Sequence, residues 1–336
     1  MATIDDVARA AGVSTSTVSY VLSGRRPISP ETRARVEASI TELGYRPNAG
    51  ARALASRRSK ILALVAPLRS DNGVPVIMHF VAGIATAARS YDHDVLLVTQ
   101  DEGPTGLARV SEGAMVDGLI VMDVEADDQR VPVLRKLGRP SVLIGLPDAP
   151  SGLNCVDLDF AGAGYEAVAH LANHGHKRVA LVGPPSAVYE RRTSFATRVL
   201  SGFETGVSTY DLTATTTACE LTYDGAATAI AKIFDAVPDV TGLVVHNEAS
   251  LGPILAVLRS SGIVVPRDLS IIAICPDDVA VDLPLPVTSI DIPGEKIGAM
   301  AVDMVMGILD ESQGAETRLL APRITDRGSC APPPER

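Results

Sequence analysis

The sequence predicts a small helical head followed by a larger α/β body, and three observations lead to this fold class. Short helical segments meet around Gly12-Val13-Ser14, near the N-terminus. From Ser59 onward, short apolar segments alternate with amphipathic ones, the pattern of parallel sheets covered by helices on both faces. The chain of 336 residues is too long for one small domain, and its hydrophobic content of 46% is ample for a folded core.

The net charge is divided unevenly between the head and the body. Residues 1–60 contain ten Lys/Arg and five Asp/Glu, a net charge of +5. The whole chain has a net charge of −10, so the remaining residues carry −15. A basic surface attracts nucleic acid through its phosphates, and an acidic body restricts that attraction to the head. The charge pattern therefore favours a DNA-binding head.

The cysteines and the lack of long apolar runs point to a cytoplasmic protein. The four cysteines are scattered along the chain: Cys155, Cys219, Cys275 and Cys330. No CxxC pair is present, so we expect reduced thiols and neither a disulfide framework nor a structural zinc site. The N-terminus carries Asp5 and Asp6 and no long apolar run, so no signal peptide is expected. No stretch of about 18 apolar residues predicts a membrane span.

The first expected helix begins after Thr3. Thr3 can cap it, with Asp6 at the third helical position in a variant of the capping box. Val7, Ala8 and Ala11 recur at helical spacing and should form its inward face.

The second expected helix follows a tight turn. Gly12 supplies the backbone freedom of the turn, and Ser14 can cap the next helix. Three apolar residues should point inward: Val18, Val21 and Leu22. Four side chains are left outward, able to reach base edges and phosphates: Thr15, Ser16, Ser19 and Tyr20. Such a pair of helices is typical of a helix-turn-helix, which inserts its second helix into the major groove.

The third expected helix begins at Ser29-Pro30-Glu31, which combines a cap, a proline in the first turn and an acid at the positive end of the helix dipole. It should run to about Gly44, with Val36, Ile40 and Leu43 facing the core. A three-helix bundle with no nucleic-acid role is the alternative. Capping, turn and charge all agree with DNA binding instead.

A short segment from Pro47 to Ala55 follows the head. Asn48 can cap a helix of about seven residues there, which is too short to be stable alone in water. We expect DNA to order it. Leu54 has no obvious core to join and could wedge between base pairs in the minor groove. A plain linker with one incidental leucine explains these residues equally well on physical grounds alone.

The body continues as two series of alternating elements. The first series has expected strands at 61–66, 95–99, 118–122 and 141–144, with helices at 75–90, between 99 and 118, and through 136. The second series consists of helix 162–173, strand 178–182, a helix ending near 205, strand 243–245, helix 248–261, strand 270–274, strand 287–290 and helix 293–309. Two doubly wound lobes would hold a ligand cleft at the carboxyl ends of their strands.

Several short motifs in residues 1–60 match a known family. They are Thr3-Ile4, Asp6-Val7-Ala8, Ala11-Gly12-Val13-Ser14, Thr17-Val18-Ser19, Leu43-Gly44-Tyr45, Pro47-Asn48 and Ala53-Leu54. The stretch closely resembles the head of the lactose repressor family of bacterial regulators. The resemblance implies that Thr15, Ser16 and Tyr20 read the operator, and that Leu54 is the minor-groove lever of a hinge helix. Position 20 is often Arg in the family, so Tyr20 departs from its usual guanine contact. The complete set expected to contact DNA is Thr3, Ser14, Thr15, Ser16, Ser19, Tyr20, Asn48 and Leu54.

The body looks like the periplasmic-binding-protein-like body of the same family. The matching motifs are Gly175-His176, Gly202-Phe203, Val265-Pro266, Leu269-Ser270 and Pro286-Val287-Thr288. The family topology implies that the chain passes between the two lobes three times. The implied division is a head at 1–46, a hinge helix and linker at 47–60, and a body at 61–336. Within the body, one lobe would comprise about 61–158 and 291–320, and the other about 159–290 and 321–336.

The resemblance also suggests where an effector would bind. His246-Asn247-Glu248 stands where the family usually has Ala-Asn-Asp, and Asn247 can both donate and accept hydrogen bonds. The family often has an acid at the position of Cys275, followed here by Asp277 and Asp278. Asn247 is therefore the strongest candidate and Cys275 a weaker one.

Other expected effector contacts are less well supported. The arginine that the family uses to hold effectors is replaced by Val199, with Arg198 next to it. The loop from Leu68 to Val76 is longer than usual, so that Asp71 or Asn72 could reach the cleft. Sugar sites commonly stack a ring on an aromatic side chain, but the chain has no Trp and only five Phe. A sugar effector is thus implied by the family and poorly supported by these residues.

Two patterns offer competing functions. The glycines of residues 162–167 follow a strand and open a helix, which mimics a dinucleotide-binding fingerprint, but no catalytic constellation accompanies them. His170, His174 and His176 have metal-ligand spacing, although His170 and His176 match ordinary family positions. We therefore expect no catalytic residue, no cofactor and no metal. A ligand-binding protein without DNA function is a third class, which the basic head disfavours.

These observations predict a cytoplasmic, ligand-responsive transcriptional regulator, most simply a repressor. As a homodimer it would bind a near-palindromic double-stranded DNA operator, one head on each half. Its C-terminal residues 323–336 include three consecutive prolines, which cannot continue a helix. We expect this tail to be extended and exposed, and to offer no leucine-heptad helix for joining dimers into tetramers.

Overall fold

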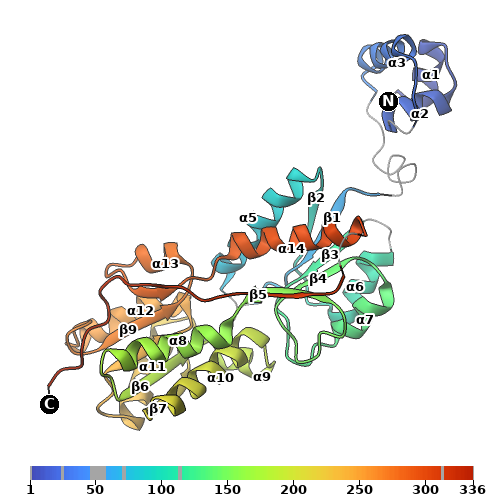
Figure 1. Ribbon diagram of the computed structural model, residues 1–336. Coiled ribbons are helices and arrows are strands. Elements are labelled where there is room, and N and C mark those ends of the chain that lie inside the picture. The colour runs from blue at the N-terminus through green and yellow to red at the C-terminus, as the bar shows by residue number, and fades with distance from the viewer. Residues whose placement is uncertain are drawn as a thin grey trace.

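A computed structural model of the chain shows a helical head and a larger body made of two α/β lobes (Figure 1). The structure describes residues 2–23, 26–45, 58–69, 73–112, 116–311 and 314–335. Four of the expected contact residues lie outside the described residues: Asn48, Leu54, Asp71 and Asn72. The elements of the head and of both lobes are otherwise described, so the remaining candidates can be located.

The head consists of three helices, α1 (Ile4–Ala11), α2 (Thr15–Ser23) and α3 (Pro30–Leu43). The expected caps are confirmed. Thr3 and Asp6 form the capping box of α1, with each side chain accepting a hydrogen bond from the other residue's backbone N–H. Ser14 Oγ accepts from the backbone N–H of Thr17, at 3.2 Å, and starts α2. Ser29 caps α3 in the same way.

Six side chains form the buried core of the head: Val7, Ala8, Ala11, Val18, Val21 and Val36. Ile40 packs against them and is only partly buried. The prediction that Leu22 and Leu43 point inward is wrong, because they are 36% and 38% exposed. Each leucine lies in the last turn of its helix, beyond the part that packs against the neighbouring helices.

Lobe 1 is built on a six-stranded parallel sheet with the order β11-β5-β4-β3-β1-β2. Its strands are β1 (Ile61–Val65), β2 (Asp94–Val98), β3 (Gly118–Val121), β4 (Ser141–Ile144), β5 (Asn154–Leu158) and β11 (Thr317–Leu320). Its helices are α5 (Val74–Ser90), α6 (Gly103–Glu112), α7 (Arg130–Leu137) and α14 (Gly294–Leu309). Helix α14 packs beside α5 although more than 200 residues separate them (Figure 1).

Lobe 2 is built on a second six-stranded sheet with the order β12-β10-β9-β8-β6-β7, parallel except for the β10–β12 pair. Its strands are β6 (Arg178–Gly183), β7 (Thr213–Ala218), β8 (Gly242–Val245), β9 (Ser270–Ile274), β10 (Thr288–Ile290) and β12 (Ile324–Thr325). Its helices are α8 (Phe160–Asn173), α9 (Ser186–Glu190), α10 (Ser194–Thr209), α11 (Tyr223–Ala236), α12 (Glu248–Ser260) and α13 (Asp277–Val281).

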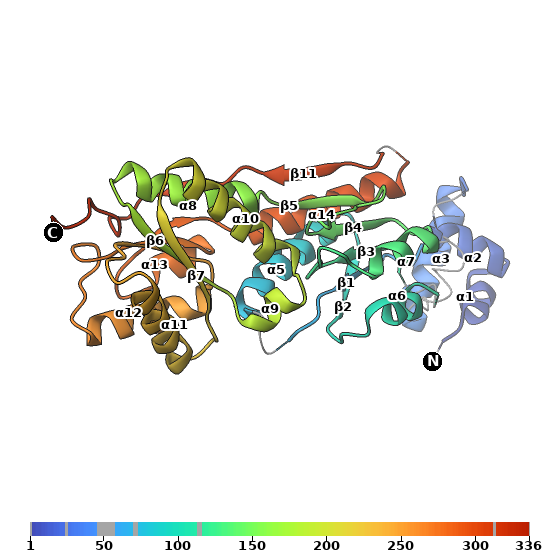
Figure 2. The same ribbon diagram turned by 90° about the horizontal axis from the view of Figure 1, so that it is seen from below.

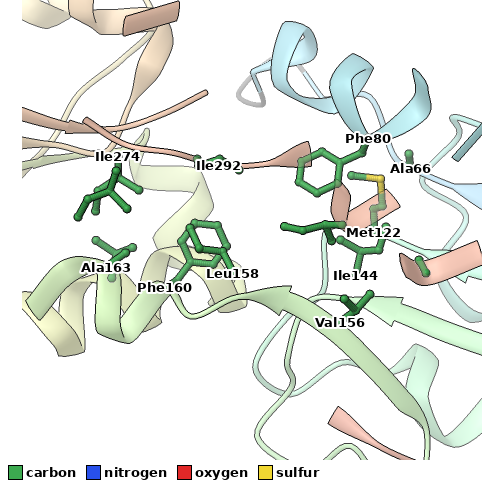
Figure 3. Packing of buried hydrophobic residues seen from close by; sticks show 14 of the residues in the cluster. Ala66, Phe80, Met122, Ile144, Val156, Leu158, Phe160, Ala163, Ile274 and Ile292 are labelled. Carbon is green, nitrogen blue, oxygen red and sulfur yellow. The ribbon is translucent and has the colours of Figure 1, made fainter. Parts of the chain in front are cut away.

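The chain passes between the two sheets at three places: from β5 into α8, from β10 into α14, and from β11 into β12 (Figure 2). One apolar cluster continues across this junction, with members from both lobes (Figure 3). Phe80 and Ile144 belong to lobe 1, Phe160 begins α8 of lobe 2, and Ile292 lies between β10 and α14. The two lobes are therefore joined by packing as well as by the three crossing segments.

The C-terminal tail differs from the prediction of an exposed segment. Ser329 is fully buried, and its hydroxyl donates to the carbonyl of Ile271 at 2.6 Å. The backbone N–H of Ala331 donates to Ser270 Oγ at 3.0 Å. An extended chain needs no helix to be held, because its backbone and short polar side chains can hydrogen-bond to the neighbouring sheet. In the part of the chain that the structure describes, no helix has the length and apolar character needed to span a membrane.

Candidate DNA interface and ligand cleft

The outward face of α2 carries the described DNA-contact candidates. Ser16 is exposed, and Thr15, Ser19 and Tyr20 are partly exposed. Val18 and Val21 anchor the opposite face of the helix in the core of the head. The exposed hydroxyls are thus presented on a helix of fixed orientation, which is the arrangement that reads base edges in a groove.

Thr3 and Ser14 have a second role besides a possible DNA contact. Both side chains are exposed, but both are engaged in capping their helices. Ser14 Oγ also lies 2.9 Å from Thr17 Oγ1. These two residues position the helix N-termini, where backbone N–H groups favour phosphate.

Arg26 is a residue of this face that the sequence pattern did not single out. Its guanidinium carbon lies over the Tyr20 ring, 5.4 Å from the ring centroid. A guanidinium stacked on an aromatic face keeps its N–H groups free in the plane. The contact depends on the path of the chain after α2, which no helical spacing could show.

A cleft between the two lobes encloses about 960 Å³, including the part open to solvent. Both lobes contribute walls: Ile77 and Phe80 from α5 of lobe 1, and Phe160 and Phe195 from α8 and α10 of lobe 2. Three of the five phenylalanines of the chain therefore line this space. The sequence showed few aromatic residues, but not that most of the phenylalanines would meet here.

Asn247 lines the cleft and also has a structural role. It lies between β8 and α12 and is only 3% exposed. Its Nδ2 donates to the carbonyl of Cys219 at 2.8 Å and to that of Gly183 at 3.3 Å. Asn247 thus ties the start of α12 to the ends of β6 and β7, and positions the lobe 2 wall.

His246 is a cleft residue that the sequence analysis did not select. It is 4% exposed, and its ring centroid lies 5.7 Å from that of Phe160 and 5.5 Å from that of Phe195. Burial lowers the pKa of His246 to about 4, so the ring is neutral at physiological pH. Its Nδ1 is buried and has no hydrogen-bond partner among the described residues.

Glu248 reaches across the cleft from the first turn of α12. A Cβ on Gly73, the residue that precedes α5, would collide with Glu248 Oε1, so the two lobes touch there. Burial raises the pKa of Glu248 above its ordinary value. A second contact between the lobes pairs His79 Nε2 of α5 with Asp278 Oδ2 of α13, at 3.3 Å.

Arg198 and Cys275, both expected to contact an effector, do not line the cleft among the described residues. Arg198 Nη1 pairs with Asp157 Oδ2 at 2.7 Å, and Nη2 donates to the carbonyl of Leu158 at 2.9 Å. Burial raises the pKa of Asp157, which does line the cleft, to about 7 despite this partner. The Cys275 side chain is fully buried in the apolar cluster of lobe 2 and is not among the residues that line the cleft.

Main-chain hydrogen bonds join the lobes beside the cleft. The backbone N–H of Ser194 donates to the carbonyl of Val124 at 2.8 Å, and that of Ala126 donates to the carbonyl of Arg192 at 2.9 Å. Val124 also lines the cleft. Any change in lobe closure must therefore move or break this bridge, next to the ligand space.

The glycines of residues 162–167 and the histidines with metal-ligand spacing have other roles in the structure. A Cβ on Gly164 would collide with the carbonyl of Val199, so this glycine of the fingerprint allows α8 and α10 to pack closely. His176 is buried and hydrogen-bonded to Thr241 and Ser270. Over the described ranges, no group of three His, Cys, Asp or Glu is placed to hold a metal ion.

The fold and these two sites define a two-lobed ligand-binding body that carries a helix-turn-helix head. Residues 3–48 match the family described as bacterial regulatory proteins of the lacI family, and residues 168–330 match the periplasmic binding protein-like domain. The HTH-type transcriptional regulator CelR of Thermobifida fusca is 31% identical over 321 residues, which is 91% of this chain and 92% of the relative. Catabolite control protein A of Priestia megaterium is 29% identical over 309 residues, covering 90% and 91% of the two chains.

Two solved structures resemble the whole chain. A CelR–cellobiose complex superposes with a TM-score of 0.71 at 27% identity and covers 98% of this chain and 100% of its own. A lac repressor dimer bound to operator and the anti-inducer ONPF has a TM-score of 0.84 at 22% identity, with coverage of 98% and 99%. The chain belongs to the LacI family. It is a cytoplasmic DNA-binding transcriptional regulator and not an enzyme, as members of this family are.

Proposed function

We propose that this regulator is a repressor that binds a near-palindromic operator as a homodimer and responds to a small molecule in the cleft. The observation that carries the proposal is the combination of an outward polar face on α2 with a cleft lined by both lobes. The first feature suits base reading, and the second lets a ligand change how the lobes are arranged.

The proposed division of labour follows the chain. Residues 1–46 would read the operator through Thr15, Ser16 and Tyr20, and residues 47–60 would form the hinge. Residues 61–336 would bind the effector and form the dimer, with lobe 1 at about 61–158 and 291–320 and lobe 2 at about 159–290 and 321–336. The sheet membership of the strands supports these limits for the lobes.

The proposed coupling runs through lobe closure. A ligand that contacts both walls binds more tightly to the protein at one degree of lobe closure than at another. The difference between the two affinities determines how far the ligand shifts the protein toward the better-binding form. Because β1 of lobe 1 follows the hinge segment directly, movement of lobe 1 in a dimer would change the spacing of the two hinges. Altered spacing would favour or disfavour simultaneous binding of two half-sites.

The effector site is proposed to centre on Asn247 and its neighbours His246 and Glu248. Names of similar proteins mention cellobiose, ribose and the maltose operon, so saccharides are the first compounds to test. The cleft offers phenylalanine rings as stacking surfaces for the ring of a ligand, which the count of aromatic residues alone did not suggest.

The experiment is an operator titration with the full-length protein. Duplexes enriched from a random pool are labelled, and fluorescence anisotropy gives the operator affinity with and without each compound of a small-molecule library. We expect at least one compound to change the affinity of wild type and not of Asn247→Ala. The melting temperature of this variant is the control, because Asn247 also holds two carbonyls. If no compound changes operator affinity, the regulatory role proposed for the cleft is refuted.

A further inference from the structure

Most of the side chains that line the cleft are apolar, and they come from both of its sides. Phe80 and Met122 come from lobe 1, Phe160 from lobe 2 and Ile292 from a crossing segment, and Figure 3 shows them converging from these different parts of the fold. Phe195 adds a third ring. Such walls favour a ligand that exchanges water for contact with aromatic and aliphatic surface.

Two of the acidic groups in the lining already have strong partners. Asp123 is ion-paired with Arg69, and Asp157 is ion-paired with Arg198. The described lining contains no Lys or Arg, whereas a third acid, Glu248, also faces the space. An anionic ligand would meet carboxyl groups without meeting a cation, so this balance disfavours it.

One buried polar atom of the lining lacks a protein partner in the described structure. His246 Nδ1 is enclosed, and its ring packs against the rings of Phe160 and Phe195, which also contact each other. An unpartnered buried nitrogen costs free energy that a hydrogen bond from a ligand would recover. The side chain of Asn247, by contrast, already donates to two carbonyls.

We propose that this cleft selects an uncharged ligand with an aromatic or otherwise apolar ring and a single hydrogen-bonding end, which pairs with His246. This inference rests on the proposed function, because it assigns a chemical class to the effector of that same site. A hydroxyl-rich free sugar fits less well. Each of its buried hydroxyls needs a partner, and burying one without a partner costs more than the apolar contact gains.

The test compares three probes by isothermal titration calorimetry on the full-length protein. Benzamide has the proposed ring and an uncharged polar end, benzoate is its anionic counterpart, and cellobiose is hydroxyl-rich. We expect benzamide to bind at least about tenfold more tightly than either of the others. Equal or tighter binding of benzoate or cellobiose overturns the inference, and so does the absence of benzamide binding.

A variant separates the hydrogen bond from the apolar walls. His246→Phe keeps an aromatic ring against Phe160 and Phe195 and removes Nδ1. Benzamide should then bind about tenfold more weakly, the usual effect of one lost hydrogen bond, while toluene binds as it does to wild type. Equal weakening of both probes contradicts the role of Nδ1. His174→Phe, outside the cleft lining, is the matched control and should change neither affinity.

The two proposals fail in different ways. If benzamide binds with the expected preference and no ligand alters operator affinity, the chemistry of the cleft stands and its regulatory role fails. If operator affinity responds to cellobiose alone, the regulatory role stands and the inferred ligand class fails.

Discussion

Tyr20 of α2 has a neighbour that its place in the sequence does not reveal. The sequence predicts that Tyr20 points outward, and in the structure the guanidinium of Arg26 lies over its ring. The outward face of α2 therefore has a guanidinium even though position 20 is Tyr. Arg26, six residues further along the chain, stacks its guanidinium on the Tyr20 ring.

Replacing Tyr20 with Ala should change which half-site base is preferred, whereas Tyr20→Phe should keep the preference because the ring face remains. An exposed cation–π contact contributes about 0.5–1 kcal/mol, and one base contact about 1–3 kcal/mol. Arg26→Gln should weaken binding in wild type more than in Tyr20→Ala. Operator titrations of the two single variants and the double variant measure this coupling. Strictly additive losses would mean that the two side chains act independently.

The buried ring of His246 should make the free energy of unfolding depend on pH. Its pKa is about 4 in the folded protein, against an ordinary value of 6.5, because burial disfavours the charged ring. Between these values the unfolded chain binds more protons, so the stability conferred by a neutral ring is lost as the pH falls from 6.5 toward 4.

The variant His246→Phe should remove part of this pH dependence. It should lose less stability than wild type between pH 7 and pH 4, by roughly 3 kcal/mol for a shift of this size. Urea unfolding at both pH values gives the comparison. His176 and Asp157 are present in both proteins, so their own contributions cancel. Identical losses in the two proteins would show that His246 is protonated without penalty.

The site was only partly predictable at this scale. The resemblance to the family indicates Asn247, which also follows an apolar strand and opens a helix. His246 looked like the end of that strand, and only tertiary packing shows its buried nitrogen beside two phenylalanine rings. Arg198 is indicated by its place next to Val199, where the family has its effector-holding arginine, but the structure pairs its guanidinium with Asp157 beside the cleft.

At the scale of elements, the head was predicted best, since its signals are local. Thr3, Ser14 and Ser29 cap helices as expected, because a cap depends on residues within one turn. Leu22 and Leu43 were placed wrongly, because helical spacing does not show where a helix stops touching its neighbours.

In the body, the strands that escaped prediction are those with polar residues. β7 (Thr213–Ala218) is an edge strand made of Thr and Ala, and β5 (Asn154–Leu158) contains Asn154 and Asp157. Neither strand is a continuous apolar run, so neither is predicted from hydrophobicity. β5 is nevertheless fully buried, because Asn154 accepts a hydrogen bond from Glu316 and Asp157 pairs with Arg198.

Replacing Leu54 tests the role proposed for the hinge segment. Leu54→Ala should weaken binding to the operator by a few kcal/mol and hardly affect binding to random DNA. The reason is that we expect Leu54 to kink the duplex only in the specific complex. Leu54 lies outside the described residues, and the resemblance to the family implies its role as a minor-groove lever. Titrations on operator and on random duplex at one salt concentration make the comparison. An equal loss on both duplexes would assign Leu54 to the linker rather than to a wedge.

At the scale of the whole molecule, the interleaving of the lobes could not be predicted from local patterns. α14 and β11 follow a second lobe in sequence and return to the first, because α14 packs on α5 and β11 pairs with β5. No spacing or composition marks such a return. Only the resemblance to a family implied it.

We expect two copies to meet through a surface of lobe 1 on which four apolar side chains are exposed. Val74 and Met78 of α5 and Leu96 and Leu97 of β2 are each between 37% and 40% exposed, and α5 contacts β2. Neighbouring exposed apolar side chains of this size are typical of an interface. β2 is also an edge strand, with an unpaired side along the sheet.

We expect Leu97→Asp to shift the full-length protein from dimer to monomer at micromolar concentration, because a buried, unpaired carboxylate opposes association. Leu319→Asp is the matched control. Leu319 is an equally exposed leucine on β11, at the opposite edge of the same sheet, and its replacement should leave the dimer intact. Light scattering gives the oligomeric state of each protein. A monomer only in the Leu319 variant would place the interface at the β11 edge of the sheet. A tetrameric wild type would contradict the expectation that the C-terminal tail does not join dimers.

The proposed function requires this chain to recognise a specific, two-fold related DNA sequence through its head. Selection of bound duplexes from a random pool tests it most directly, with wild type and with a variant in which Ser16 and Tyr20 are both replaced by Ala. Wild type should enrich one near-palindromic sequence, and the variant should lose the conserved bases of each half-site while still binding DNA non-specifically. No enriched sequence with wild type, or the same sequence with both proteins, would mean that Ser16 and Tyr20 of the head do not read a specific operator.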